Sequence, residues 1–78
     1  MQPLTLSLLQ THTHWHDAEA NRALFDGLFA QVPDAAQLVV LPEMFSTGFT
    51  LDSSQVAESM EGATVAWMRE RAQALGKV

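Results

Sequence analysis

Residues 38–45 carry the sequence LVVLPEMF, and this stretch decides the fold. Four branched apolar residues in a row predict a strand that is covered on both faces, as in a parallel sheet. Pro42 has no backbone N–H to donate to a neighbouring strand, so it fits where the pairing ends. Glu43 therefore leaves the sheet at the carboxyl end of the strand, which is the end where open α/β proteins bind their ligands.

The composition limits the kinds of partner that the chain can have. Its 78 residues are 47% hydrophobic and 17% charged, which is typical of a small globular domain. The net charge is −5, and the 4 Lys and Arg residues form no cluster. This argues against nucleic acid as a partner and against attachment to a membrane surface by charge.

Cysteine is absent, so the chain has neither disulfides nor a cysteine-based zinc site. The amino-terminal stretch lacks the pattern of a signal peptide, because no Lys or Arg precedes it and Thr5 and Ser7 interrupt it. No run approaches the ~20 apolar residues of a membrane span. We therefore expect a cytoplasmic protein.

The first half of the chain predicts a strand, a helix and a second strand, the last over residues 37–41. Residues 4–9 alternate apolar and polar side chains before an apolar pair, which is typical of a strand. The polar residues 10–16 predict a loop, and Asp17 is a suitable N-cap for a helix over residues 17–32. This helix has an apolar stripe with the spacing of an amphipathic helix. The stripe consists of Ala20, Leu24, Phe25, Leu28, Phe29 and Val32.

The second half predicts a loop, a helix and the start of a strand. Residues 45–61 have no sustained period, which indicates a long loop with a short helical turn. A helix follows over residues 62–75, and Gly76 is suited to a left-handed cap at its end. The apolar face of this helix consists of Val65, Met68, Ala72 and Leu75. Residues 77–78 look like the start of another strand.

This order of elements is typical of an α/β fold with parallel strands. Two strands and two helices cannot cover both faces of a parallel sheet, nor both of its edges. We therefore expect residues 1–78 to be the amino-terminal portion of a larger single domain, truncated where a third strand begins.

Glu43 is the first candidate for chemistry. In one interpretation it is a general base, which contributes about 10²–10⁴-fold to a rate when a nucleophile and a charge stabiliser converge with it. The chain supplies neither group in an obvious way. In the other interpretation Glu43 is a solvated or helix-capping acid, and its position alone favours the two interpretations equally.

We expect structural roles for the other polar residues. The three histidines between His12 and His16 indicate a surface loop without a carboxylate ligand, so we assign no metal. Asn21 lies at the edge of the first helical stripe, and we expect its amide to bridge backbone groups of the neighbouring loop. Ser46 and Thr47 lack a Gly-x-Ser-x-Gly setting, which favours hydroxyls that satisfy loop backbone over nucleophiles. The glycines are too dispersed to cradle a phosphate, and no cofactor is expected.

Residues 38–49, LVVLPEMFSTGF, resemble the nitrilase, or carbon–nitrogen hydrolase, superfamily, and within it the omega-amidases. An apolar run followed by Pro-Glu-Met-Phe and then Thr-Gly-Phe is a much more specific pattern than Pro-Glu alone. The similarity extends over nearly the whole chain. The first strand ends at Gln10, Asn21 lies early in the first helix, and residues 62–68 and 74–76 resemble the start and end of the next helix.

The resemblance implies an αββα sandwich that is commonly built into homodimers or larger assemblies. It also implies a Glu-Lys-Cys catalytic set, of which only the glutamate maps onto this chain, at Glu43. The family lysine lies well downstream, so Lys77 does not correspond to it, and the cysteine lies further on. Because both are missing, we expect residues 1–78 to be inactive by themselves.

Omega-amidases hydrolyse the terminal amides of 2-oxo acids such as 2-oxoglutaramate, through a cysteine thioester. The resemblance therefore implies a small-molecule amide substrate, with Glu43 as proton acceptor. Phe45 and Phe49 could line the substrate pocket, although packing is the more ordinary role for each. The alternative is a small α/β binding or interaction module without catalysis. A nucleotide-binding half-domain is disfavoured by the missing glycine loop.

Overall fold

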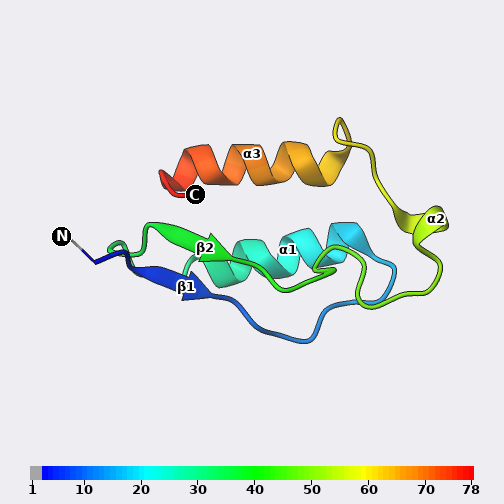
Figure 1. The fold of residues 1–78 in the computed structure, drawn as a ribbon, viewed down its shortest axis with the longest axis horizontal. Coiled ribbons are helices and arrows are strands. Elements are labelled where there is room, and N and C mark those ends of the chain that lie inside the picture. Colours follow the sequence, from blue (N-terminus) through cyan, green and yellow to red (C-terminus); the bar gives the residue numbers. More distant parts are fainter. Residues whose placement is uncertain (1–2) are drawn as a thin grey trace.

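The structure, a computed structural model, describes residues 3–78. Its elements are β1 (Leu6–Leu8), α1 (Ala18–Phe29), β2 (Leu38–Val40), α2 (Ser53–Val56) and α3 (Ala63–Leu75), in that order (Figure 1). This order confirms the predicted α/β class. The short helix α2 is the helical turn that was expected inside the long loop.

The two strands pair in parallel, as predicted, with Leu6 opposite Leu38. Each strand is 3 residues long, which is shorter than the sequence pattern suggested. The backbone contact extends past the paired residues, because the Leu9 N–H donates to the Val40 carbonyl at 3.0 Å. The strands are therefore short, but their register is well defined.

The expected start of a third strand is confirmed at Val78. Its N–H donates to the Gln37 carbonyl at 3.0 Å, and its carbonyl accepts from the Val39 N–H at 2.9 Å. These two bonds lie on the edge of β2 that β1 leaves free, and their pattern is that of a parallel ladder. The central position in the sheet consequently belongs to β2.

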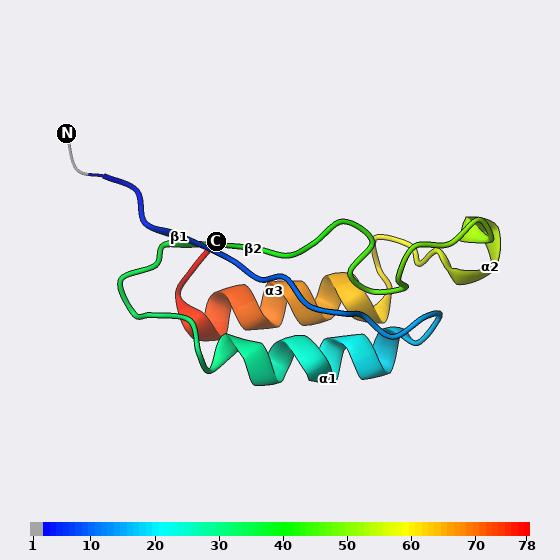
Figure 2. The same cartoon turned by 90° about the horizontal axis from the view of Figure 1, so that it is seen from below.

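The helices α1 and α3 lie side by side on one face of the sheet, and both run back against the direction of the strands (Figures 1 and 2). The opposite face of the sheet is uncovered within residues 3–78, where Leu6 and Leu8 are exposed. The prediction of a strand buried on both faces is therefore wrong for this part of the chain. The reason is that both crossing helices pack on the same side, and Val40 remains exposed.

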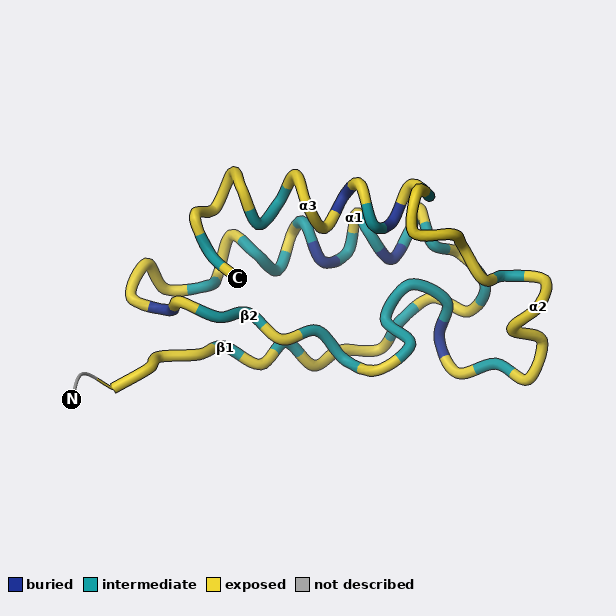
Figure 3. Tube along the Cα trace, turned by 45° about the horizontal axis from the view of Figure 1, so that its top comes forward, coloured by how far each residue is buried: buried dark blue, intermediate teal, exposed yellow. Residues whose placement is uncertain are grey.

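An aromatic cluster forms the core between the helices and the sheet. Phe25 is fully buried and contacts Phe45 edge-on, with ring centroids 5.7 Å apart. Trp67 is buried and stacks on Phe29 at 5.5 Å, and it also lies 6.0 Å from Phe45. Buried residues accordingly concentrate along the facing sides of α1 and α3 (Figure 3). Aromatic pairs in this geometry add about 0.5–1.5 kcal/mol beyond the burial of their area.

The predicted helix ends follow from local chemistry. The Asp17 side chain accepts from the Ala20 N–H at 3.0 Å, which confirms it as the N-cap of α1. Gly76 adopts a left-handed conformation with φ 65°, which confirms it as the cap that ends α3. The helix α1 ends at Phe29 rather than near Val32, because the Val32 N–H bonds the Phe29 carbonyl in a tighter turn.

The face that α3 buries differs from the predicted one. Thr64 and Trp67 are its buried residues, whereas Met68 and Leu75 are 44% and 38% exposed. The buried face points at α1. The predicted apolar stripe instead borders a groove beside β2, in which Met68, Ala72 and Leu75 lie together with Val78. The apolar stripe on α3 therefore exists, but within residues 3–78 no side chain fills the groove that it lines.

A polar cluster fastens α1 to α3. Arg71 donates to both carboxylate oxygens of Asp26, from Nε at 2.6 Å and from Nη2 at 3.1 Å. The indole N–H of Trp67 donates to the same carboxylate at 3.1 Å. The hydrogen bond from Arg71 holds the pKa of Asp26 below its ordinary value. A bidentate pair of this kind fixes the rotation of one helix relative to the other as well as their separation.

Removal of the buried ring should show how much stability the cluster supplies. We expect Phe25→Ala to cost about 3–5 kcal/mol of unfolding free energy, because it leaves a cavity in the core. Phe49→Ala is the matched control, since Phe49 is 72% exposed and its loss should cost less than about 0.5 kcal/mol. Urea unfolding followed by tryptophan fluorescence measures both. Equal costs for the two variants would contradict the assigned core.

Acid should weaken the link between the helices. The pKa of Asp26 is lowered in the folded state, so its contribution to stability is present above its unfolded pKa of about 4 and is lost as the pH falls through the folded value. The melting temperature should therefore drop as the pH falls below the unfolded pKa of about 4, and Asp26→Asn should flatten this drop. Differential scanning calorimetry against pH measures it. A parallel decline in both proteins would refute the contribution of Asp26.

Candidate active site

Glu43 lies directly after the carboxyl end of β2, as predicted, and its side chain is exposed. It opens a tight turn over residues 43–47. Met44 adopts a left-handed conformation with φ 53°, which is uncommon for a residue with a side chain. The Met44 carbonyl accepts from the Gly48 N–H at 2.9 Å and closes the turn. The backbone that carries Glu43 is thus bent sharply and held closed.

Phe45 anchors this turn to the core. Its ring contacts Phe25 on α1 and Trp67 on α3. The apolar packing role that the sequence favoured for Phe45 is the one its contacts support. The turn between Glu43 and Phe45 therefore joins an exposed carboxylate to a half-buried ring.

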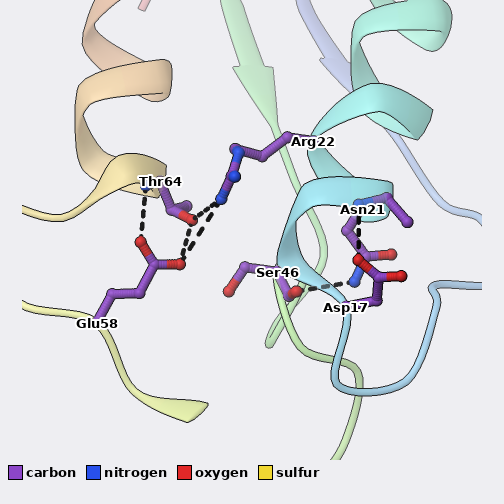
Figure 4. Close-up of polar contacts among 7 residues, drawn as sticks. Asp17, Asn21, Arg22, Ser46, Glu58 and Thr64 are labelled. Atoms are coloured by element: carbon purple, nitrogen blue, oxygen red, sulfur yellow. Dashed lines mark hydrogen bonds and ion pairs between the residues drawn. The ribbon is translucent and has the colours of Figure 1, made fainter.

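Asn21 anchors the same turn through its amide. It is fully buried, and its Nδ2 donates to the carbonyls of Ser46 and His14, both at 2.8 Å. Its Oδ1 accepts from the His14 N–H at 2.6 Å. Figure 4 shows the amide reaching from the first turn of α1 to Ser46. The expectation that Asn21 bridges backbone groups is met, and the bridge extends beyond the neighbouring loop to the Glu43 turn.

The loop after β1 runs beside the loop after β2 and is bonded to it at several points. The His16 N–H donates to the Thr47 carbonyl at 2.7 Å, and the His16 ring nitrogen lies 2.5 Å from the Thr50 hydroxyl. The indole N–H of Trp15 donates to the Phe49 carbonyl at 3.1 Å. Two loops that follow neighbouring strands are in this way joined into one rim at the carboxyl end of the sheet.

Gly48 allows the two loops to approach closely. It is buried with φ 72°, and a Cβ at this position would lie 3.4 Å from the Cα of Trp15 and 3.4 Å from the Thr13 hydroxyl. Its left-handed conformation therefore favours glycine, whereas the neighbouring atoms would make ordinary contact with a Cβ. This gives the Thr-Gly-Phe part of the sequence pattern a physical reason.

Phe49 differs from Phe45 in its placement. Its side chain is 72% exposed, and none of the aromatic contacts within residues 3–78 involves it. The structure thus brings Glu43, Asn21 and Phe45 together around one turn and leaves Phe49 outside it. A part for either phenylalanine in a substrate pocket stays a prediction.

Lys77 lies at the opposite end of β2 from Glu43. Its ammonium donates to the carbonyls of Asp34, at 3.0 Å, and of Ala36, in the loop that enters the strand. The neighbouring Val78 pairs with the amino end of β2. Lys77 therefore satisfies loop carbonyls and cannot act on the same group as Glu43.

Sequence reasoning missed a second carboxylate with a defined role. Glu58 accepts from the backbone N–H of Thr64 at 2.8 Å and from its hydroxyl at 2.5 Å, and Arg22 lies 3.8 Å away (Figure 4). The hydrogen bond from the Thr64 hydroxyl lowers the pKa of Glu58. Because Gly62, the N-cap residue of α3, has no side chain to cap the helix, Glu58 serves as the cap from outside the helix. The sequence signal for this role was a helix start without a capping side chain of its own, preceded by a loop that contains acidic residues.

The histidines do not form a metal centre in this structure. Within residues 3–78, no three His, Asp or Glu side chains gather closely enough to hold a metal ion. His14 contributes its backbone to Asn21, and His16 contacts Thr50. In the same part of the chain, no helix has the length and apolar character needed to cross a membrane.

Three features together indicate the class of protein: the glutamate at the strand end, its closed turn and the parallel sheet beneath it. The chain belongs to the carbon–nitrogen hydrolase family, whose model matches residues 5–78. Its fold closely follows part of a solved CN-hydrolase superfamily protein, XC1258 from Xanthomonas campestris, with a TM-score of 0.90 and 42% sequence identity. That match covers 99% of this chain and 29% of the solved one.

Two curated relatives are omega-amidases. The omega-amidase YafV of Yersinia enterocolitica is 39% identical over 69 residues, which are 88% of this chain and 26% of the relative. The omega-amidase YafV of Escherichia coli strain K12 is 33% identical over 73 residues, which are 94% of this chain and 28% of the relative. The chain thus spans little more than a quarter of the length of the curated relatives that it matches.

A methyl group at position 48 should disturb the rim. We expect Gly48→Ala to cost about 1–2 kcal/mol, because the left-handed backbone opposes a Cβ. Gly27→Ala is the matched control, since nothing lies within 4 Å of a Cβ there and alanine favours the interior of α1. Thermal melts of both variants test this. A melting temperature that Gly48→Ala leaves unchanged would contradict the assigned role of Gly48.

Proposed function

We propose that residues 1–78 form the amino-terminal portion of an omega-amidase, a hydrolase that converts the terminal amide of a small 2-oxo acid to a carboxylate and ammonia. The observation that carries this proposal is the position of Glu43, at the carboxyl end of a central parallel strand and on a turn fixed from two sides. Membership of the carbon–nitrogen hydrolase family and the similarity to two omega-amidases support it.

In the proposed mechanism Glu43 works as a general base. It accepts the proton of a cysteine thiol, and the thiolate attacks the amide carbonyl carbon of the substrate. A lysine and a backbone N–H stabilise the negative charge that develops on the carbonyl oxygen. The C–N bond then breaks, and ammonia leaves with the proton returned from Glu43.

The second half of the cycle uses the same glutamate. Water gives a proton to Glu43 while its oxygen attacks the thioester carbon, and cleavage of the C–S bond returns the thiol and releases the carboxylate. The cysteine and the lysine lie beyond residue 78 in this proposal, because Cys is absent from the chain and Lys77 is committed to loop carbonyls. Residues 1–78 alone would therefore bind no substrate productively.

We further propose 2-oxoglutaramate or a close analogue as the substrate, and a homo-oligomeric cytoplasmic enzyme without a cofactor. An exposed carboxylate on a fixed turn needs no metal or organic group to accept a proton. The acidic chain, with net charge −5, also fits a small-molecule substrate better than a nucleic acid.

The role of Glu43 is tested in the full-length protein by Glu43→Gln, which keeps the shape of the side chain and removes the base. We expect the rate of ammonia release from 2-oxoglutaramate to fall by about 10²–10⁴-fold. Glu61→Gln is the matched control, because Glu61 is an exposed acid on the adjoining loop and its loss should leave the rate within about twofold.

Near-normal turnover of Glu43→Gln would overturn the assignment of the base. Glutamine and asparagine, tested as alternative amides, separate the substrate class from the reaction. Hydrolysis of these amino acids at the rate of the 2-oxo amide would leave an amidase but contradict the preference for a 2-oxo acid.

A further inference from the structure

We propose that Asn21 is the positioning residue for Glu43: its buried amide holds the turn that aims the carboxylate. This inference rests on the proposed function of Glu43 as the base and adds a second residue to the machinery of that site. Asn21 does not touch the reacting atoms. It acts through the backbone of residues 43–47.

The Glu43 carboxylate has no restraint of its own. It is exposed, and no hydrogen bond or ion pair within residues 3–78 involves it. Its direction is therefore set by the backbone from which it projects. A base must approach its proton within about 2.6–3.2 Å, so this backbone has to be held in one conformation.

That conformation carries strain that something must oppose. Met44, the residue after Glu43, is left-handed at φ 53°, which costs about 1–2 kcal/mol for a residue with a side chain. The turn is closed on itself by the bonds from Thr47 and Gly48 to the Met44 carbonyl. Those bonds set the shape of the turn but not its orientation on the sheet.

Two side chains and the His16 N–H, which donates to the Thr47 carbonyl at 2.7 Å, hold the orientation of the turn. Of the two side-chain contacts, only that of Asn21 is directional. Phe45 packs in the aromatic cluster, a contact that tolerates small rotations of the ring. The bond from Asn21 Nδ2 to the Ser46 carbonyl, at 2.8 Å, is directional, and its donor side chain is fully buried. The amide is itself held by His14 on both its donor and its acceptor side.

The chemistry of this site selects an amide. It presents two carbonyl oxygens and one N–H, so the side chain must offer two donors and one acceptor at once. Aspartate would have the same shape but would face both carbonyls with acceptors. Serine offers a single short donor. Asn21 also lies on the first turn of α1, which Asp17 caps, so the amide projects from a backbone that is itself hydrogen-bonded.

The experiment uses the full-length protein and the release of ammonia from 2-oxoglutaramate. We expect Asn21→Asp and Asn21→Ser to lower kcat by about 10–100-fold while KM changes less than about threefold, because a misdirected base impairs the chemical step and not substrate binding. Each variant is assayed about 15 °C or more below its own melting temperature, so that unfolding does not contribute to the loss of activity.

Asp26→Asn is the matched control, since it breaks the bond between α1 and α3 without touching the Glu43 turn. It should lower the melting temperature while kcat stays within about threefold of the unaltered protein. A structural role alone for Asn21 would make its variants resemble this control, with similar losses of melting temperature and a nearly unchanged kcat. That result would overturn the inference.

The other outcomes separate this inference from the proposed function. Loss of turnover in Glu43→Gln together with normal kcat in both Asn21 variants would remove the positioning role and keep the base. Normal turnover in Glu43→Gln would remove the proposed function itself. If Asn21→Asp fails to fold, Asn21→Ser decides, and failure of both to fold would assign Asn21 to folding and overturn the positioning role.

Discussion

The edge-on contact between Phe45 and Phe25 is the interaction on which the rest of this structure depends. It lies where three parts of the chain meet: α1, α3 and the turn after β2. Without the ring of Phe45, the turn would lose its aromatic contacts with Phe25 on α1 and Trp67 on α3. A chain of this size buries only about 60% of its unfolded surface, so each large core residue carries much of the stability.

Polar contacts join the helices and the turn in addition to the aromatic cluster. Asp26 with Arg71 joins the helices at one end, and Glu58 caps the start of α3 at the other. Asn21, in the first turn of α1, reaches the turn that carries Glu43. The exposed carboxylate is therefore supported by buried neighbours, which is the arrangement that a functional side chain needs if its direction is to be fixed. The face of the sheet opposite the helices, which includes Leu6 and Leu8, stays open within residues 3–78.

Much of the fold could be predicted because its signals are local. Asp17 and Gly76 act on backbone groups within a few residues of themselves, so their roles as caps follow from the order of residues. The face that α3 buries was predicted wrongly because the stripe containing Met68 is apolar but lies beside a groove. Trp67 was preferred in the core since its indole also finds a carboxylate partner in Asp26.

The sequence by itself determined the α/β class, the parallel strands, the position of Glu43 at a strand end and the family to which the pattern belongs. The first three follow from hydrophobic period, Pro42 and cap residues, all of which act over short distances along the chain, whereas the family follows from the resemblance of residues 38–49 to its pattern. Only the tertiary structure decided which groups hold Glu43 in place. Asn21 and Ser46 are 25 residues apart, and Asp26 and Arg71 are 45 apart. Such pairs form only when packing brings the helices and the turn together, because no local preference encodes which buried amide meets which carbonyl.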